Sequence, residues 1–222
     1  MTTEKLLNAQ YISVQLFKAI EESNLIVAGK SEEQLTADVC DLALKRFGIE
    51  KHWHKKIVRS GKNTLAIYPD NPPNRIIDKE DILFIDLGPI VEGYEADIGR
   101  TYVLGQDPRK MRLKDDVEEA WYEIQEWYQK QTTLKASDLF QYALDKAEEF
   151  GWEFGGEIAG HIVGKYPHEQ PPDPKSMELD IHPANHNDMF LRDAEGNKRH
   201  WILELQFIDR DNEMGGYFEQ LL

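Results

Sequence analysis

The chain has 222 residues, a formal net charge of −15 and 41% hydrophobic residues, the composition of an ordinary globular protein. Its 41 acidic against 26 basic residues argue against a nucleic-acid partner, which needs a basic surface, and against binding to an anionic membrane. The single cysteine excludes an internal disulfide, and no apolar segment is long enough for a signal peptide or a membrane span, so we expect a cytoplasmic protein.

The first sixty residues are predicted to form two helices and a strand. Apolar residues recur at helical spacing over 5–28. Ser31 precedes an acidic turn and has the character of an N-cap for the second helix. Gly48 follows that helix and suits a left-handed C-cap.

Strand-like segments and two further helices follow in the middle of the chain. Residues 69–75 form a turn-rich loop, and two strand-like runs, 82–88 and 93–105, are joined by a short connection. Residues 115–131 and 137–150 have helical patterns. The order helix, helix, strand therefore begins a second time.

The last quarter of the chain ends in a predicted hairpin. Residues 167–198 are rich in Pro, Asp and Asn and predict a long connection, which the strand 201–208 and the segment 215–222 follow. The repeated order of elements predicts one domain made of two similar halves, with a site at the seam between them. Chance similarity between amphipathic helices is the alternative explanation of the repeat.

Two acids lie inside apolar segments that are predicted to be buried strands. Asp86 lies in ILFIDL and Glu204 lies in WILELQF. An ionised carboxylate in such a place is costly unless it is paired with a cation or a metal ion. A basic partner, or a strand end that is less buried than its sequence indicates, is the alternative for either acid taken alone.

Hairpin geometry predicts a partner for the first acid. If the first hairpin turns symmetrically about residues 91–92, Asp86 lies opposite Asp97. Directly opposed residues of antiparallel strands share a face, with Cβ atoms about 4.5–5.5 Å apart. The symmetric turn is an assumption, and a bulge would shift the register.

The second hairpin repeats this arrangement. A symmetric turn about residues 211–212 places Glu204 opposite Glu219. Carboxylates that are paired in this way repel each other unless they share a proton or bind a cation. His161 is a candidate imidazole and follows the glycine-rich stretch GGEIAGHIVG, which allows the backbone to approach a bound group closely. A surface residue or a satisfied core residue is the alternative for a single histidine. Four carboxylates and one imidazole form a ligand set for two divalent metal ions, with Mn²⁺ preferred and Co²⁺, Fe²⁺ or Zn²⁺ as alternatives.

These acids and this histidine resemble the ligands of a known group, the pita-bread metallopeptidases, which include methionine aminopeptidase, Xaa-Pro aminopeptidase, prolidase and creatinase. The shared order is Asp86, Asp97, His161, Glu204 and Glu219. The motifs SGKN and GYEADIGRTYVLG are similar to those of the Xaa-Pro branch, and GHIVGKYPHE resembles a metal-binding histidine followed seven residues later by a second one, here His168.

The resemblance implies an α+β fold and a chemistry for the site. The fold is the pita-bread fold, with two pseudo-symmetric helix–helix–strand halves around a curved antiparallel sheet, expected here as a single catalytic domain over residues 1–222 without an N-terminal accessory domain. Asp97 and Glu219 would bridge two metal ions, and Asp86 would complete the shell of one of them. A water molecule that bridges both ions would be the nucleophile.

The remaining implied roles concern the second ion and the substrate. His161 and Glu204 would complete the second shell, Glu204 would also act as general base, and His168 would hydrogen-bond the substrate. Tyr68 stands where the family usually has a further histidine, and a tyrosine cannot shuttle protons near neutral pH as imidazole does. The chain also replaces the family's Glu-Pro-Gly at residues 204–206.

The implied function is a metal-dependent exopeptidase, similar to an Xaa-Pro aminopeptidase or dipeptidase, that acts on short peptides. A homodimer is a family-level expectation. The alternatives are an enzyme similar to methionine aminopeptidase, a non-catalytic binding module with the same fold, and a metal-independent C–N hydrolase similar to creatinase. The complete carboxylate set disfavours the last two.

Overall fold

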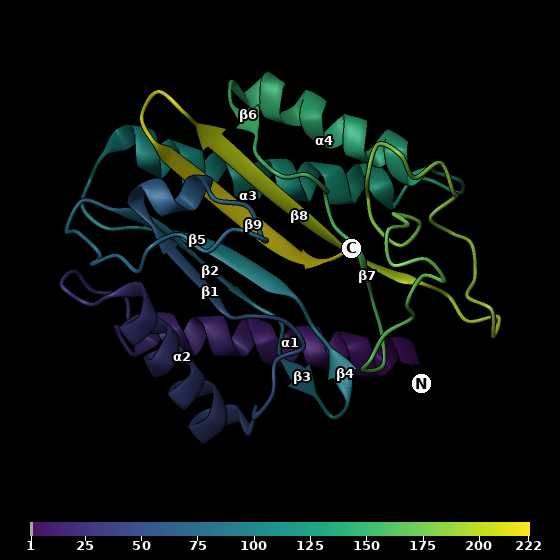
Figure 1. Cartoon of the computed structure of the whole chain (residues 1–222), viewed down its shortest axis with the longest axis horizontal. Coiled ribbons are helices and arrows are strands. Elements are labelled where there is room, and N and C mark those ends of the chain that lie inside the picture. The colour runs from purple at the N-terminus through teal and green to yellow at the C-terminus, as the bar shows by residue number, and fades with distance from the viewer. Residues whose placement is uncertain (1) are drawn as a thin grey trace.

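The computed structural model describes residues 2–222, which form four α-helices, one short 3₁₀-helix and nine strands (Figure 1). The helices are α1 (Thr2–Glu22), α2 (Glu32–Phe47), α3 (Pro108–Tyr128) and α4 (Ala136–Phe150), with the 3₁₀-helix η1 at Gly61–Leu65. The strands are β1 (Ile57–Ser60), β2 (Ile82–Leu87), β3 (Ile90–Val91), β4 (Tyr94–Glu95), β5 (Ile98–Val103), β6 (Glu153–Phe154), β7 (Ile162–Val163), β8 (His200–Asp209) and β9 (Met214–Leu221).

The ends of α2 form as the sequence predicts. Ser31 and Gln34 make a reciprocal capping box at its start, and Gly48 ends it in the left-handed conformation at φ 65°. Two other boundaries differ from the prediction. Helix α1 ends at Glu22, and α3 begins at Pro108 because the side chain of Asp107 accepts hydrogen bonds from the first free backbone N–H groups of that helix.

The strands form one antiparallel sheet in the order β1-β2-β5-β9-β8-β6, with β7 paired to β8, while β3 and β4 form a separate ribbon. In Figure 1, α1 and α2 lie along the half of the sheet that contains β1, β2 and β5, and α3 and α4 lie along the half that contains β8 and β9. The two halves meet where Gly99 of β5 pairs with Glu219 of β9. The predicted arrangement of two helix–helix–strand halves is confirmed.

The two hairpins differ in how well their registers follow the prediction. Glu204 lies opposite Glu219, as predicted. Asp86 lies opposite Gly99, so the predicted opposition to Asp97 is wrong. The cause is the turn, which is centred on residues 92–93 and has positive φ at both positions. Because the shift is two residues and strand side chains alternate, Asp97 still lies on the same face as Asp86.

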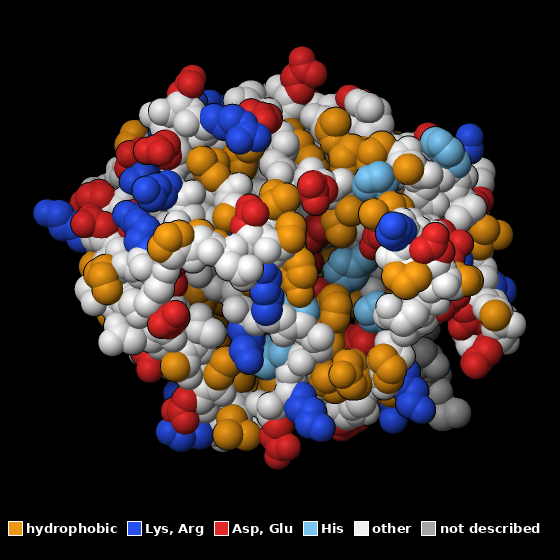
Figure 2. Space-filling model, viewed as in Figure 1, with side chains coloured by type: hydrophobic (Ala, Val, Ile, Leu, Met, Phe, Trp, Pro, Cys, Tyr) orange, Lys and Arg blue, Asp and Glu red, His pale blue; other side chains and the backbone are white. Residues whose placement is uncertain are grey.

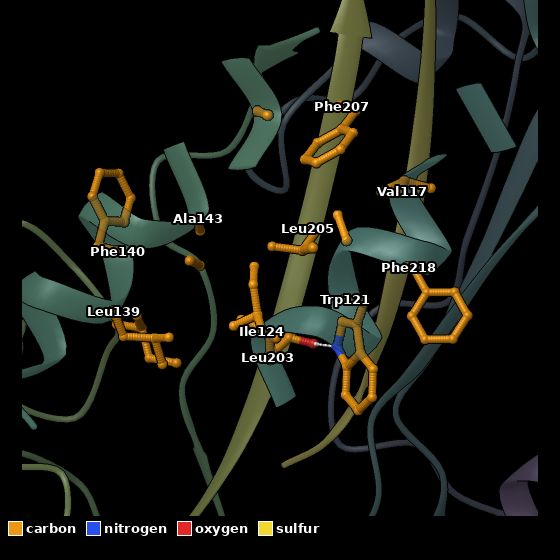
Figure 3. Close-up of a cluster of buried hydrophobic side chains, with 14 of the residues drawn as sticks. Val117, Trp121, Ile124, Leu139, Phe140, Ala143, Leu203, Leu205, Phe207 and Phe218 are labelled. Atoms are coloured by element: carbon orange, nitrogen blue, oxygen red, sulfur yellow. Dashed lines mark hydrogen bonds between the residues drawn. The ribbon is translucent and has the colours of Figure 1, made fainter. Parts of the chain in front are cut away.

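Alternation along the strands separates a core from a site. Leu83, Ile85 and Leu87 pack in a core with residues of α1 and α2. On the other half of the sheet, residues of β8 pack against α3 and α4, and the buried indole of Trp121 donates a hydrogen bond to the carbonyl oxygen of Leu203 at 2.8 Å (Figure 3). The residues between these positions face away from the helices. None of the helices within residues 2–222 combines the length and hydropathy needed to cross a bilayer.

Candidate metal centre

A cavity of about 370 Å³ lies on the face of the sheet that the helices leave open. Its lining includes all five of the predicted metal ligands: Asp86, Asp97, His161, Glu204 and Glu219. Figure 2 shows histidine side chains in and beside a hollow on this side of the molecule. The fold therefore brings together acids from both hairpins and the predicted imidazole.

Asp97 lies at the centre of the cluster and contacts two imidazoles. One carboxylate oxygen, Oδ2, lies 3.3 Å from Nε2 of His161, and the other, Oδ1, lies 3.0 Å from Nε2 of His54. Two groups of potential ligands share Asp97, one with His54 and Asp86 and the other with His161 and Glu219. Within each group the ligand atoms lie within 4.8 Å of one another.

Gly160 positions His161 against strand β8. Gly160 has φ +133°, and a Cβ atom there would lie 2.0 Å from the carbonyl oxygen of Ile202. The adjacent N–H of Ile202 donates to the carbonyl oxygen of His161 at 2.8 Å. At this glycine, the close approach predicted for the glycine-rich stretch is therefore to a neighbouring strand rather than to a bound group. Nδ1 of His161 lies 2.9 Å from the carbonyl oxygen of Ile162, which leaves Nε2 facing Asp97.

Tyr217 holds Glu204, one acid of the pair on the second hairpin. Its hydroxyl group donates to Oε2 of Glu204 at 2.7 Å, and its ring stacks on Phe84 with 4.9 Å between centroids. The ring occupies the space that a side chain at position 99 would fill, since a Cβ atom on Gly99 would lie 2.3 Å from a Tyr217 ring carbon. One oxygen of Glu204 is thus fixed by a neutral donor.

Burial and neighbouring charges shift the pKa values of the acids and imidazoles in the cluster. Burial raises the pKa of Asp86 to about 7 and that of Glu219 well above its ordinary value. Burial also acts to raise the pKa of Asp97, but the two neighbouring imidazoles lower it below its ordinary value. Burial lowers the pKa of both imidazoles, but the Asp97 carboxylate outweighs it and raises the pKa of His54 to about 10 and that of His161 to about 9.

Two orphaned oxygens indicate what the cluster can bind. Among the described residues, Oδ1 of Asp86 and Oε2 of Glu219 are buried side-chain atoms without a hydrogen-bond partner. Such atoms are costly unless a cation or a water molecule meets them. The donor set of carboxylate oxygens and imidazole nitrogens suits Mn²⁺, Fe²⁺, Co²⁺ or Zn²⁺. The residues present therefore fit a pair of divalent metal ions.

His168 lines the same cavity and is held by an acid that the sequence prediction missed. Glu95 is 1% exposed, and its carboxylate accepts hydrogen bonds from the backbone N–H groups of Gly164 and His168. It also lies 2.8 Å from Nδ1 of His168. This contact leaves Nε2 as the ring nitrogen that can meet a substrate. Glu95 occurs in GYEADIGRT, but no local pattern shows that it meets His168.

His54 is the second residue that the sequence prediction missed. Its side chain is only 5% exposed and reaches Asp97 from the segment before β1. The predicted stand-in, Tyr68, is 54% exposed and lies farther out, with its ring centroid 6.1 Å from that of His54. Tyr68 lines the cavity, and its catalytic role stays a prediction.

Comparisons with known proteins show what the chain is similar to. The sequence is 35% identical over 94 residues to an Xaa-Pro dipeptidase of Pyrococcus furiosus, an alignment that covers 42% of this chain and 26% of the dipeptidase. The structure is similar to a prolidase from Thermococcus sibiricus, with a TM-score of 0.75 and 24% identity over 98% of this chain and 55% of that one. It is also similar to a methionine aminopeptidase from Thermotoga maritima, with a TM-score of 0.70 and 16% identity over 98% of this chain and 90% of that one.

The structural similarities confirm the predicted α+β pita-bread fold. The chain spans about half the length of the prolidase that it resembles. A model of the metallopeptidase family M24 matches residues 4–193, which is well over half of the chain. The chain belongs to metallopeptidase family M24.

Proposed function

We propose that this chain is a two-metal-dependent exopeptidase of the Xaa-Pro type, which hydrolyses a peptide bond in a short peptide. The observation that carries the proposal is the pair of ligand groups that share Asp97 on the wall of the cavity. The orphaned oxygens of Asp86 and Glu219 support it, because both residues belong to these groups and a bound cation would satisfy both oxygens.

The proposed ligands divide between two ions. Asp97 and Glu219 would be shared, Asp86 would serve one ion, and His161 with Glu204 would serve the other. When bound, paired divalent ions activate a water molecule and polarise the scissile carbonyl group.

The residues of the chain supply the proton transfers. Glu204 accepts the proton of the attacking water through the oxygen that Tyr217 leaves free, and the water oxygen bonds to the carbonyl carbon. The C–N bond then breaks, and the proton passes to the leaving nitrogen. In its imidazolium form, in which both ring nitrogens carry a proton, His168 donates from Nε2 to the carbonyl oxygen as negative charge develops there, while its Nδ1–H donates to Glu95.

The cavity sets the size of the substrate. Its volume of about 370 Å³ lies at the small end of the range for ligand sites, which suits a dipeptide or the end of a short peptide. Ile57, Phe84 and Ile67 give the wall an apolar part that would receive a prolyl ring or another apolar side chain. The Xaa-Pro dipeptidase relative supports the Xaa-Pro type over the methionine type.

The test is an assay of the whole chain after chelation and reconstitution with Mn²⁺ or Co²⁺. The substrates are Xaa-Pro dipeptides, longer Xaa-Pro peptides and Met-peptides. We expect Xaa-Pro cleavage that requires the metal, and its loss in Asp97→Ala but not in the exposed-turn control Asp211→Ala.

Three results would contradict the proposal. Full hydrolysis by Asp97→Ala would show that the proposed metal site takes no part in the reaction. Binding of two metal ions without hydrolysis of any peptide would indicate a non-catalytic module, and preference for Met-peptides would assign the methionine type instead.

A further inference from the structure

We propose that His54 is a sixth protein ligand of the metal pair and serves the ion on the Asp86 side of Asp97. This inference rests on the proposed function, because it concerns the same two ions. The proposed function includes only one imidazole ligand, that of His161, whereas here each of the two ions has one imidazole of its own.

The imidazoles of His54 and His161 are held by the same kind of hydrogen bond. Nδ1 of His54 lies 2.6 Å from the carbonyl oxygen of Lys55, and Nδ1 of His161 lies 2.9 Å from that of Ile162, in both cases the residue that follows. Such a carbonyl accepts a hydrogen bond from Nδ1–H and leaves Nε2 as the metal-binding nitrogen, which is the usual support of a histidine ligand. The two Nε2 atoms face different oxygens of Asp97.

The distances around His54 fit ligands of a shared ion. Its Nε2 lies 3.0 Å from Oδ1 of Asp97 and 3.6 Å from Oδ1 of Asp86. Two atoms that bind one ion at about 2.1 Å are about 3.0 Å apart at a right angle and about 3.6 Å apart at roughly 118°. A direct hydrogen bond accounts for only the first distance, since 3.6 Å is too long for one and Oδ1 of Asp86 has no partner.

The fold holds His54 in this place by means of its neighbours. Trp53 donates from its backbone N–H to the carbonyl oxygen of Gly88 at 2.8 Å, and from its indole to that of Ala96 at 3.0 Å. A Cβ atom on Gly88 would lie 2.1 Å from Cδ2 of His54 and 2.3 Å from Nε2. The imidazole therefore reaches the carboxylates only because residue 88 has no side chain.

A second arrangement has the same contacts, with His54 as an imidazolium that neutralises Asp97 and is released when metal binds. The two arrangements differ in the number of imidazoles on the metal pair. Proton NMR of the whole chain loaded with Co²⁺ counts them, because each imidazole bound through Nε2 gives one strongly shifted, exchangeable Nδ1–H signal. The carbonyl partners of both Nδ1 atoms protect these protons from exchange with solvent.

We expect two such signals in the wild-type protein and one in His54→Gln. The loss of this ligand should reduce the affinity for one of the two ions at least as much as the loss of a ligand's supporting partner does, which is roughly 10- to 100-fold. Gly88→Ala keeps the imidazole but displaces it, and should also lose one signal. The matched control His186→Gln changes an exposed histidine and should keep both signals.

The outcomes separate this inference from the proposed function. Two bound ions with one imidazole signal in the wild-type protein would overturn the assignment of His54 and leave the proposed function intact. A wild-type protein that binds no metal would overturn the proposed function itself. The wild-type count needs no variant, so a variant that fails to fold leaves the test decisive.

Discussion

Replacing Gly160 by alanine tests whether the backbone before His161 must lie against strand β8. The new Cβ atom would lie 2.0 Å from the carbonyl oxygen of Ile202, a strand backbone atom that cannot rotate away, and φ is +133° at this position. A non-glycine residue in a sparsely populated region of this kind costs about 1–3 kcal/mol. Relief of the clash would break the hydrogen bonds from Ile202 N–H to His161 and from Ile181 N–H to Gly160, a further loss of about 1–3 kcal/mol.

The free energy of unfolding should therefore fall by about 2–6 kcal/mol, a large part of the total for a domain of ordinary stability. Urea unfolding of the chelated protein, followed by circular dichroism, measures this change, and a Co²⁺ titration of the folded variant should show weaker binding. Gly164→Ala is the matched control. A Cβ atom there would meet Cβ of His168 at 3.5 Å and its Cα at 3.8 Å, both ordinary contacts, and φ is not positive. Equal stability of the two variants would refute the reasoning.

Three further predictions concern the substrate histidine, the acid cluster and the core. Glu95→Gln should keep both metal ions but lower kcat for the best peptide roughly 10- to 150-fold, the equivalent of the ~1.5–3 kcal/mol of a charged hydrogen bond. The reason is that the neutral amide keeps one acceptor oxygen in place of the two carboxylate oxygens that serve Gly164 and His168. An unchanged kcat would show that Glu95 does not act through His168. Binding of metal at pH 7 should release more than one proton per chain, since the pKa of Asp86 is about 7 and that of His161 about 9, so apparent affinity should rise with pH from 6 to 9. Calorimetry in two buffers of different ionisation enthalpy measures this release, and a value of zero would contradict it. Trp121→Ala should lower the free energy of unfolding by about 3–5 kcal/mol in urea, and a loss below 1 kcal/mol would contradict the assigned core position.

The sequence predicted those features whose interacting residues lie close together in the chain. The capping box at Ser31 and the glycine that ends α2 formed as expected, because their partners lie within a few residues in the sequence. The pairing of Glu204 with Glu219 was also predictable, since the second hairpin turns symmetrically. The first hairpin was displaced by two residues because the turn uses the positive φ of Glu92 and Gly93, and only the glycine is a sequence signal for such a turn.

The contacts that complete the site were not predictable in this way. His54 meets Asp97 because β1 pairs with β2, with Ile57 opposite Asp86, and because Gly88 leaves room for the ring. A pairing between segments about thirty residues apart has no signature in either segment alone. The contact of Glu95 with the histidine of YPHEQP also depends on tertiary structure.

The central claim is that the acids of the two hairpins converge because two divalent cations bind between them. A crystal grown with Mn²⁺ and measured at a wavelength where manganese scatters anomalously tests this directly. We predict two anomalous peaks, one on either side of the Asp97 carboxylate, the first beside Asp86 and the second beside His161. Peaks elsewhere in the molecule, or none within bonding distance of Asp97, would contradict the account.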